Sequence, residues 1–77
     1  MYKLNLSYIK NRRIQLGITL QDMASNLGFK NSSTYMKYEN GTYSFKAEQL
    51  PYLAKHLNCK ITDFFAKNVS EKETKTA

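Results

Sequence analysis

Short hydrogen-bonding side chains gather at residues 31–34, and a lysine follows at position 37. Shortly before this segment, Gly28 and Phe29 predict the end of one helix and a tight turn before the next. The free N-terminus of a helix and outward-facing short polar side chains suit contact with the phosphates and base edges of a DNA groove. The chemistry predicted here is hydrogen bonding to nucleic acid.

The charge balance of the chain agrees with a polyanionic partner. Twelve Lys and Arg against six Asp and Glu give a net charge of +6 over 77 residues. Glu71, Lys72, Glu73 and Lys75 cancel one another near the C-terminus, so the excess positive charge lies in the part expected to fold. A net charge can also serve only to keep a small protein in solution, so solubility without a nucleic-acid partner remains an alternative explanation at this point.

Other residues with chemical potential are isolated. His56 has no second metal ligand at a suitable spacing and is expected to be a satisfied surface histidine. A single Cys59 forms no internal disulfide, and it is expected to be half-buried in a reducing compartment. The sequence has no nucleophile and base at a plausible spacing and no glycine-rich phosphate loop. We therefore expect no enzyme, catalytic residue, metal, cofactor or small-molecule substrate.

No apolar run resembles a signal peptide or reaches the length of a membrane span. We expect a protein without membrane contact, located in the cytoplasm of a bacterium or a phage-infected host cell. The length and the 42% hydrophobic content fit one small domain, residues 1–67, followed by a disordered polar tail, residues 68–77.

Residues that typically cap helices divide this domain into predicted helices. Asn5 caps a predicted first helix that runs to about residue 16, with Leu6, Ile9, Arg13 and Leu16 on one face. Thr19 caps a second, Leu20 to Leu27, with Asp22 in its first turn.

Three further helices follow. The third, residues 32–40, turns Tyr35 and Tyr38 inward and leaves Ser32, Ser33, Met36 and Lys37 outside. The fourth begins near Gln49, because Pro51 is tolerated only in a first turn. Thr62 caps a short fifth helix, residues 63–67, which brings Ile61 and Phe64 into the core. With no alternating strand pattern, the sequence predicts an all-α domain of five helices.

The residues of this pattern match a known family in order. They are Arg13-Ile14-Gln15-Leu16-Gly17-Ile18-Thr19, Asp22-Met23-Ala24, Leu27-Gly28 and Tyr38-Glu39-Asn40-Gly41. From about residue 9 to residue 65 the chain resembles the helix-turn-helix domain of phage Cro proteins and lambda-type repressors, the Cro/C1 or XRE family. The resemblance implies a five-helix lambda-repressor-like fold that binds double-stranded operator DNA, together with related lysogeny-switch modulators as possible relatives.

The resemblance implies a role for individual residues. Ser32, Ser33, Met36 and Lys37 fall on the helix that reads base edges, and Lys37 is suited to guanine acceptors. Arg13 and Glu39 look like the ion pair of the family that fixes this helix. Phosphate contacts are expected from polar and basic residues around it, namely Lys10, Arg12, Thr19, Gln21, Lys30, Asn40 and Thr42. Helix capping by Ser32, Ser33 and Thr34 is the competing interpretation.

Two departures from the family bear on function. Many members begin the second helix with a phosphate-contacting Gln, where this chain has Leu20 and a shifted Gln21. The turn at residues 29–31 also looks one residue longer. Two functions follow as hypotheses: a sequence-specific regulator that binds DNA as a homodimer, and an antirepressor that docks on a partner repressor protein through the same face, with Met36 and Tyr43 as anchors.

Overall fold

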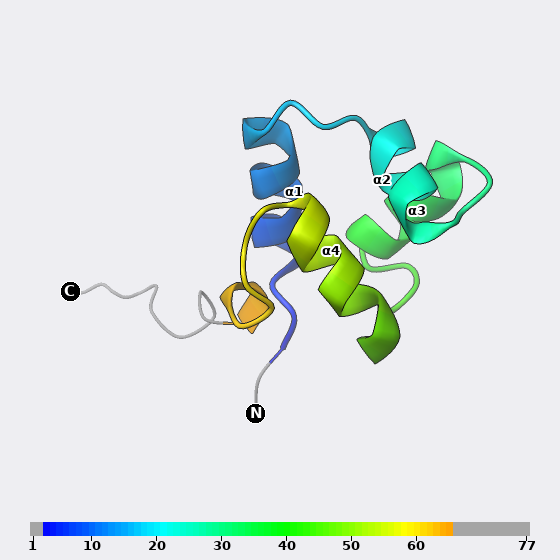
Figure 1. Ribbon diagram of the computed structural model, residues 1–77. Helices are drawn as coiled ribbons and strands as arrows, with labels where there is room; N and C mark the ends of the chain where they lie inside the picture. The colour runs from blue at the N-terminus through cyan, green and yellow to red at the C-terminus, as the bar shows by residue number, and fades with distance from the viewer. Residues whose placement is uncertain (1–2, 66–77) are drawn as a thin grey trace.

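The computed structural model describes residues 3–65, which form helices joined by short turns (Figure 1). The elements in chain order are α1 (Leu6–Gln15), α2 (Leu20–Leu27), α3 (Ser32–Glu39), the 3-10 helix η1 (Ala47–Gln49) and α4 (Leu50–His56). Between residues 3 and 65 there is no β-strand. The predicted all-α fold class is confirmed, while the predicted polar tail, residues 68–77, lies outside the described residues.

Local hydrogen bonds explain where the first helices begin. The side chain of Asn5 accepts a hydrogen bond from the backbone N–H of Tyr8 at 3.1 Å, as predicted for the cap of α1. Thr19 caps α2 by accepting from the N–H of Asp22 at 3.0 Å, and the Asp22 carboxylate accepts from the N–H of Thr19 at 3.3 Å. This reciprocal arrangement satisfies two backbone donors that the helix itself leaves unpaired.

The fourth helix begins as Pro51 requires. Residues Ala47–Gln49 form the 3-10 turn η1, and Pro51 lies in the first turn of α4. Proline has no N–H to donate, so this position loses no helical hydrogen bond.

The segment after α4 confirms the predicted start of the fifth helix and corrects one prediction about the core. Its last turn is held by the backbone N–H groups of residues 63, 64 and 65, each bonded to the carbonyl three residues earlier, and the Asp63 carboxylate accepts from the N–H of Lys60. Residues 63–65 are helical, so this helix begins directly after Thr62, at the predicted position. Ile61 is exposed because Phe64 fills the space beside α1 and α4. Residues 66 and 67 of the predicted fifth helix lie outside the described residues.

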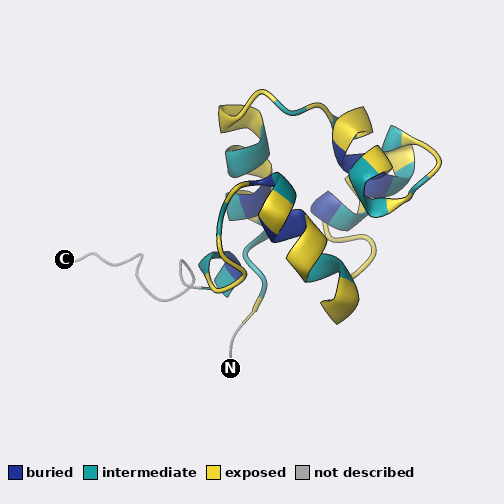
Figure 2. Cartoon of the chain, in the orientation of Figure 1, coloured by how far each residue is buried: buried dark blue, intermediate teal, exposed yellow. Residues whose placement is uncertain are grey.

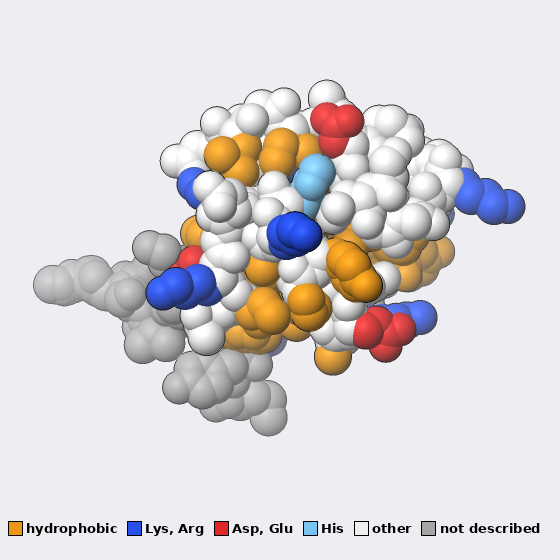
Figure 3. Space-filling view, viewed as in Figure 1, with side chains coloured by type: hydrophobic (Ala, Val, Ile, Leu, Met, Phe, Trp, Pro, Cys, Tyr) orange, Lys and Arg blue, Asp and Glu red, His pale blue; other side chains and the backbone are white. Residues whose placement is uncertain are grey.

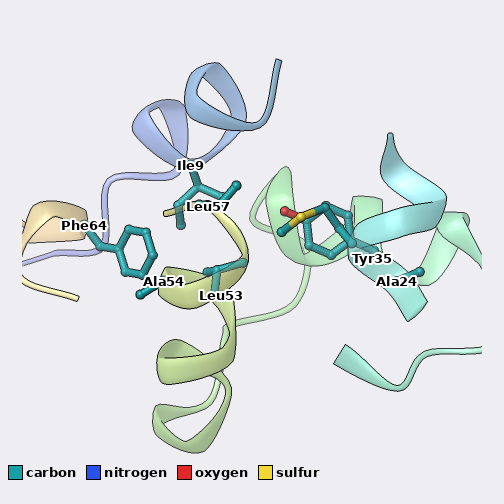
Figure 4. Packing of buried hydrophobic residues seen from close by; sticks show 8 residues of the cluster. Ile9, Ala24, Tyr35, Leu53, Ala54, Leu57 and Phe64 are labelled. Carbon is teal, nitrogen blue, oxygen red and sulfur yellow. The ribbon is translucent and has the colours of Figure 1, made fainter. Parts of the chain in front are cut away.

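The core lies where the helices approach one another, as Figure 2 shows by burial. Ile9 of α1 lies beside Leu57 at the end of α4, and Tyr35 of α3 faces α2 (Figure 4). The buried hydrophobic residues are Ile9, Met23, Ala24, Tyr35, Leu53, Ala54, Leu57 and Phe64. Leu16, predicted on the inner face of α1, is instead exposed, because α1 ends at Gln15 and the chain turns away through Gly17, whose φ is 70°.

The left-handed backbone at Gly28 gives a test of the turn between α2 and α3. The φ of Gly28 is 81°, and a Cβ added there would meet no atom within 4 Å. Gly28→Ala should therefore lower the free energy of unfolding through backbone strain alone, by about 1–2 kcal/mol. Gly28→Asn is the control and should lose less, because Asn adopts this conformation more readily. Equal urea midpoints for the wild type and Gly28→Ala would contradict the strain argument.

Candidate nucleic-acid interface

Helix α3 presents one exposed face to the surroundings. At about 100° per residue, Ser33 and Asn40 lie near the centre of this face, with Met36 and Lys37 on its two sides. All four residues are exposed, whereas Tyr35 and Glu39 on the opposite face are buried. Ser32 is half-buried at the margin. We call Ser33, Met36, Lys37 and Asn40 the α3 face.

The cap of α3 leaves the serines available. The side chain of Asn31 accepts from the backbone N–H of Thr34 at 2.9 Å and also from its hydroxyl at 3.1 Å. Asn31 is thus the N-cap, and the competing interpretation of Ser32 and Ser33 as the capping residues is wrong. The exposed hydroxyl of Ser33 is free of this structural task.

The turn before α3 is fixed by backbone bonds and by an aromatic stack. The N–H of Phe29 donates to the carbonyl of Ala24 at 2.8 Å across the left-handed Gly28. The ring of Phe29 then stacks on Tyr38, with ring centroids 4.9 Å apart and planes 11° from parallel. These contacts join the end of α2 to the last turn of α3.

A buried charge pair anchors the C-terminal end of α3. The Nε of Arg13 donates to Glu39 Oε2 at 2.8 Å, and its Nη2 donates to Oε1 at 3.1 Å. Its Nη1 donates to the carbonyl of Ile18 at 3.1 Å, and the hydroxyl of Tyr35 donates to Glu39 Oε2 at 2.8 Å. The side chains of Arg13 and Glu39 are only 11% and 4% exposed. The predicted ion pair is therefore present as a bidentate pair with its remaining donors partly satisfied.

The pKa of the Tyr35 hydroxyl depends strongly on these surroundings. Burial raises the pKa of its hydroxyl far above the ordinary value, and the hydrogen bond to Glu39 and the negative charge of Glu39 raise it further. The phenol therefore stays a neutral donor to the carboxylate over the physiological range of pH.

The predicted phosphate contacts separate into two groups. Lys10 and Lys30 are exposed, as are Thr19 and Gln21, although Thr19 also caps α2 and the Gln21 amide donates to Ser25 at 3.4 Å. Asn40 accepts through its Oδ1 from the N–H and the hydroxyl of Thr42, at 2.9 and 2.7 Å. Both donors of Thr42 are thereby used within the loop, while the amide NH2 of Asn40 remains available as a donor.

Arg12, one of the predicted phosphate contacts, has a structural role in the folded chain. Its Nε donates to the carbonyl of Leu57 at 2.9 Å, and its Nη2 donates to that of Asn58 at 3.1 Å. These carbonyls belong to the end of α4, which lacks helical partners for them. The guanidinium therefore joins α1 to α4.

A shallow hollow of about 280 Å³ lies beside the α3 face, on the side of Met36. Its lining residues are Lys10, Arg13, Leu20, Met36, Glu39 and Asn40. Leu20, which stands where the family often has Gln, thus contributes apolar surface rather than a hydrogen-bond donor. The α3 face is consequently polar at its centre and apolar on one side.

Of the two isolated residues, His56 differs from the expectation and Cys59 agrees with it. His56 is half-buried and, among residues 3–65, its Nε2 has no hydrogen-bond partner, so the expectation of a satisfied surface histidine is wrong. Cys59 is half-buried as expected, and burial raises the pKa of its thiol. In the described part of the chain no three His, Cys, Asp or Glu residues lie together as metal ligands would.

One contact of the α3 face was not predicted from the sequence. The Nζ of Lys37 lies 5.7 Å from the ring centroid of Tyr43, in the loop after α3. Helical periodicity gives no information about a loop residue, so only the folded chain brings these two together.

Comparison with protein families agrees with this arrangement. A family model described as a helix-turn-helix domain matches residues 7–69 of the chain. No curated protein and no solved structure matches. Within the described residues, none of the helices has the length and apolar character needed to cross a membrane.

The ion pair predicts a marked loss of stability when one partner is removed. Arg13→Met leaves the buried Glu39 carboxylate without its counter-ion and should lower the free energy of unfolding by about 3–5 kcal/mol. The double variant Arg13→Met with Glu39→Met removes both charges and should recover a large part of this loss. Urea unfolding of the three proteins tests this, and a single variant as stable as the wild type would contradict it.

Tyr35 predicts a loss of stability at alkaline pH. In the unfolded chain its phenol releases a proton near pH 10, whereas the folded protein retains that proton because its pKa is raised. The folded state then binds more protons, so stability is complete below pH 10 and falls as the pH rises above it. Unfolding measured between pH 8 and 11 should show a steeper decline for the wild type than for Tyr35→Phe, and equal slopes would refute this assignment.

Proposed function

The chain belongs to the helix-turn-helix domain family, and on this premise we propose that it is a sequence-specific DNA-binding transcriptional regulator of the phage or mobile-element type. The observation that carries the proposal is the α3 face, in which Ser33, Lys37 and Asn40 are exposed while Arg13 and Glu39 hold the other side of the helix. A helix supported in this way has the shape and the donors to enter a major groove.

The chemistry of the face divides into two tasks. Ser32, Ser33, Met36 and Lys37 would meet base edges, and Lys37 is the residue best suited to specificity, because its ammonium donates to the adjacent O6 and N7 acceptors of guanine. Phosphates would be met by Asn40 at the C-terminal end of the face and by the residues that flank it, namely Lys10, Thr19, Gln21 and Lys30.

We expect a homodimer on DNA. One α3 face covers only a few base pairs, and palindromic operators present two half-sites about one helical turn, roughly 34 Å, apart. The loop after Gly41 and the segment after α4 are the candidate contacts between two copies. The regulator would act in the cytoplasm, without catalysis and without a cofactor.

A specific observation also favours a second candidate, an antirepressor that docks on a partner repressor. Met36 is 44% exposed beside the hollow that Leu20 lines. Exposed apolar side chains of this kind commonly anchor protein contacts, whereas the usual phosphate-binding Gln is missing at position 20. The two candidates differ in whether purified protein retains DNA at all.

The test begins with a mobility-shift assay on the DNA that flanks the gene and on duplexes selected from a random-sequence pool. A site-specific complex should form, and its affinity should fall steeply between two salt concentrations because phosphate contacts release counterions. Retention of a neighbouring repressor without any DNA complex would overturn the regulator in favour of the antirepressor.

Lys37→Met should weaken the specific complex by about 1–3 kcal/mol, roughly 5- to 150-fold, with little effect on nonspecific DNA. Lys10→Met should weaken all DNA complexes alike and reduce the salt slope by about one for each lost phosphate contact. Lys55→Met on α4 removes the same charge away from the α3 face and is the matched control. Equal losses for Lys37→Met and Lys55→Met on specific DNA would exclude base reading by Lys37.

A further inference from the structure

Tyr43 lies next to the α3 face although it follows the helix in sequence. Its backbone N–H donates to the carbonyl of Lys37 at 3.0 Å, so the loop folds back along the end of α3. Asn40 and Thr42 hold the same loop by the two hydrogen bonds between them. The side chain of Tyr43 is nevertheless 45% exposed and therefore contributes little to the core.

The ammonium of Lys37 lies over the ring of Tyr43 in a cation–π contact. The distance of 5.7 Å from Nζ to the ring centroid is within the range of about 6 Å in which a cation is attracted to an aromatic face. Lysine otherwise has a flexible four-carbon stem and many rotamers, which must be restricted when the ammonium binds a fixed acceptor. Contact with the ring restricts them before any ligand arrives.

A series of aromatic contacts fixes the ring itself. Tyr43 packs edge-on against Tyr38, with centroids 5.4 Å apart and planes at 70°. Tyr38 in turn stacks on Phe29 of the turn before α3 and packs against Phe45 at 5.4 Å. A continuous series of rings therefore runs from the turn before α3 to the Lys37 ammonium near the end of the helix. It consists of Phe29, Tyr38 and Tyr43.

We propose that Tyr43 is a positioning residue for DNA reading, which holds the Lys37 ammonium at the edge of the α3 face where it meets guanine N7 and O6. This inference rests on the proposed function, because it needs a DNA partner. It assigns Tyr43 a role different from the protein anchor that its exposure alone indicates. The positive charge next to the ring favours an electron-rich acceptor over an apolar partner.

The first measurement needs no DNA. In the free protein, the ε-methylene protons of Lys37 should show an upfield NMR shift caused by the ring current of Tyr43. Tyr43→Phe keeps a ring and should keep the shift, whereas Tyr43→Leu keeps apolar bulk without a ring and should lose it. Equal shifts in the wild type and Tyr43→Leu would overturn the inference.

The second measurement uses the duplex selected with the wild type, with each guanine replaced in turn by 7-deazaguanine, which lacks the N7 acceptor. At one guanine in each half-site the wild type and Tyr43→Phe should lose about five- to tenfold in affinity. Lys37→Met should be insensitive at that guanine. Tyr43→Leu should bind the natural duplex about two- to fivefold more weakly, the size of an exposed cation–π contact, and its penalty at that guanine should be smaller.

The outcomes separate the inference from the proposed function. An unchanged 7-deazaguanine penalty in Tyr43→Leu would overturn the positioning role while DNA binding stands. A penalty lowered equally at every guanine, with a lower melting temperature, would mean a general structural role and would also overturn it. Absence of any selected duplex would overturn the proposed function and the inference together, and binding of Tyr43 to a repressor in NMR titrations would then support a protein partner.

Discussion

The bidentate pair between Arg13 and Glu39 is the interaction on which the placement of α3 depends. It joins the last turn of α1 to the last turn of α3, and the third donor group of Arg13 holds the carbonyl of Ile18 in the connection to α2. Because both charged groups are nearly excluded from water, neither has a good alternative to the other. A small apolar core alone would define the position of an eight-residue helix less sharply than this pair does.

Because of this anchor, α3 has only one exposed side. Tyr35 and Glu39 occupy its inner side, so Ser33, Met36 and Lys37 can meet only what approaches from outside. The direction of the helix is fixed at its last turn, where the Phe29 ring stacks on Tyr38 and Arg13 binds the neighbouring Glu39. Two independent contacts at this turn, one aromatic and one ionic, contribute to the preorganisation that groove reading requires.

The charge distribution shows how such a small domain would meet a polyanion. Basic side chains are spread over the face seen in Figure 3 rather than gathered into one patch, and apolar groups lie between them. Part of the positive charge belongs to Arg12 and Arg13, whose guanidinium groups form hydrogen bonds within the protein. Arg12 donates to backbone carbonyls, and Arg13 donates to a carboxylate. Affinity would therefore depend on a few exposed lysines such as Lys10 and Lys30, and specificity on the short face of α3.

The sequence by itself determined where the first helices begin and end, because Asn5, Thr19 and Gly28 act through hydrogen bonds and φ angles within a few residues. It also indicated the inner side of α3 by periodicity, and the ion pair through a family resemblance. Only the tertiary structure decided that Arg12 caps α4 and that Tyr43 lies under Lys37. Those contacts join segments through loops and across helices, where their geometry depends on the packing of the whole chain and leaves no periodic signal in the sequence.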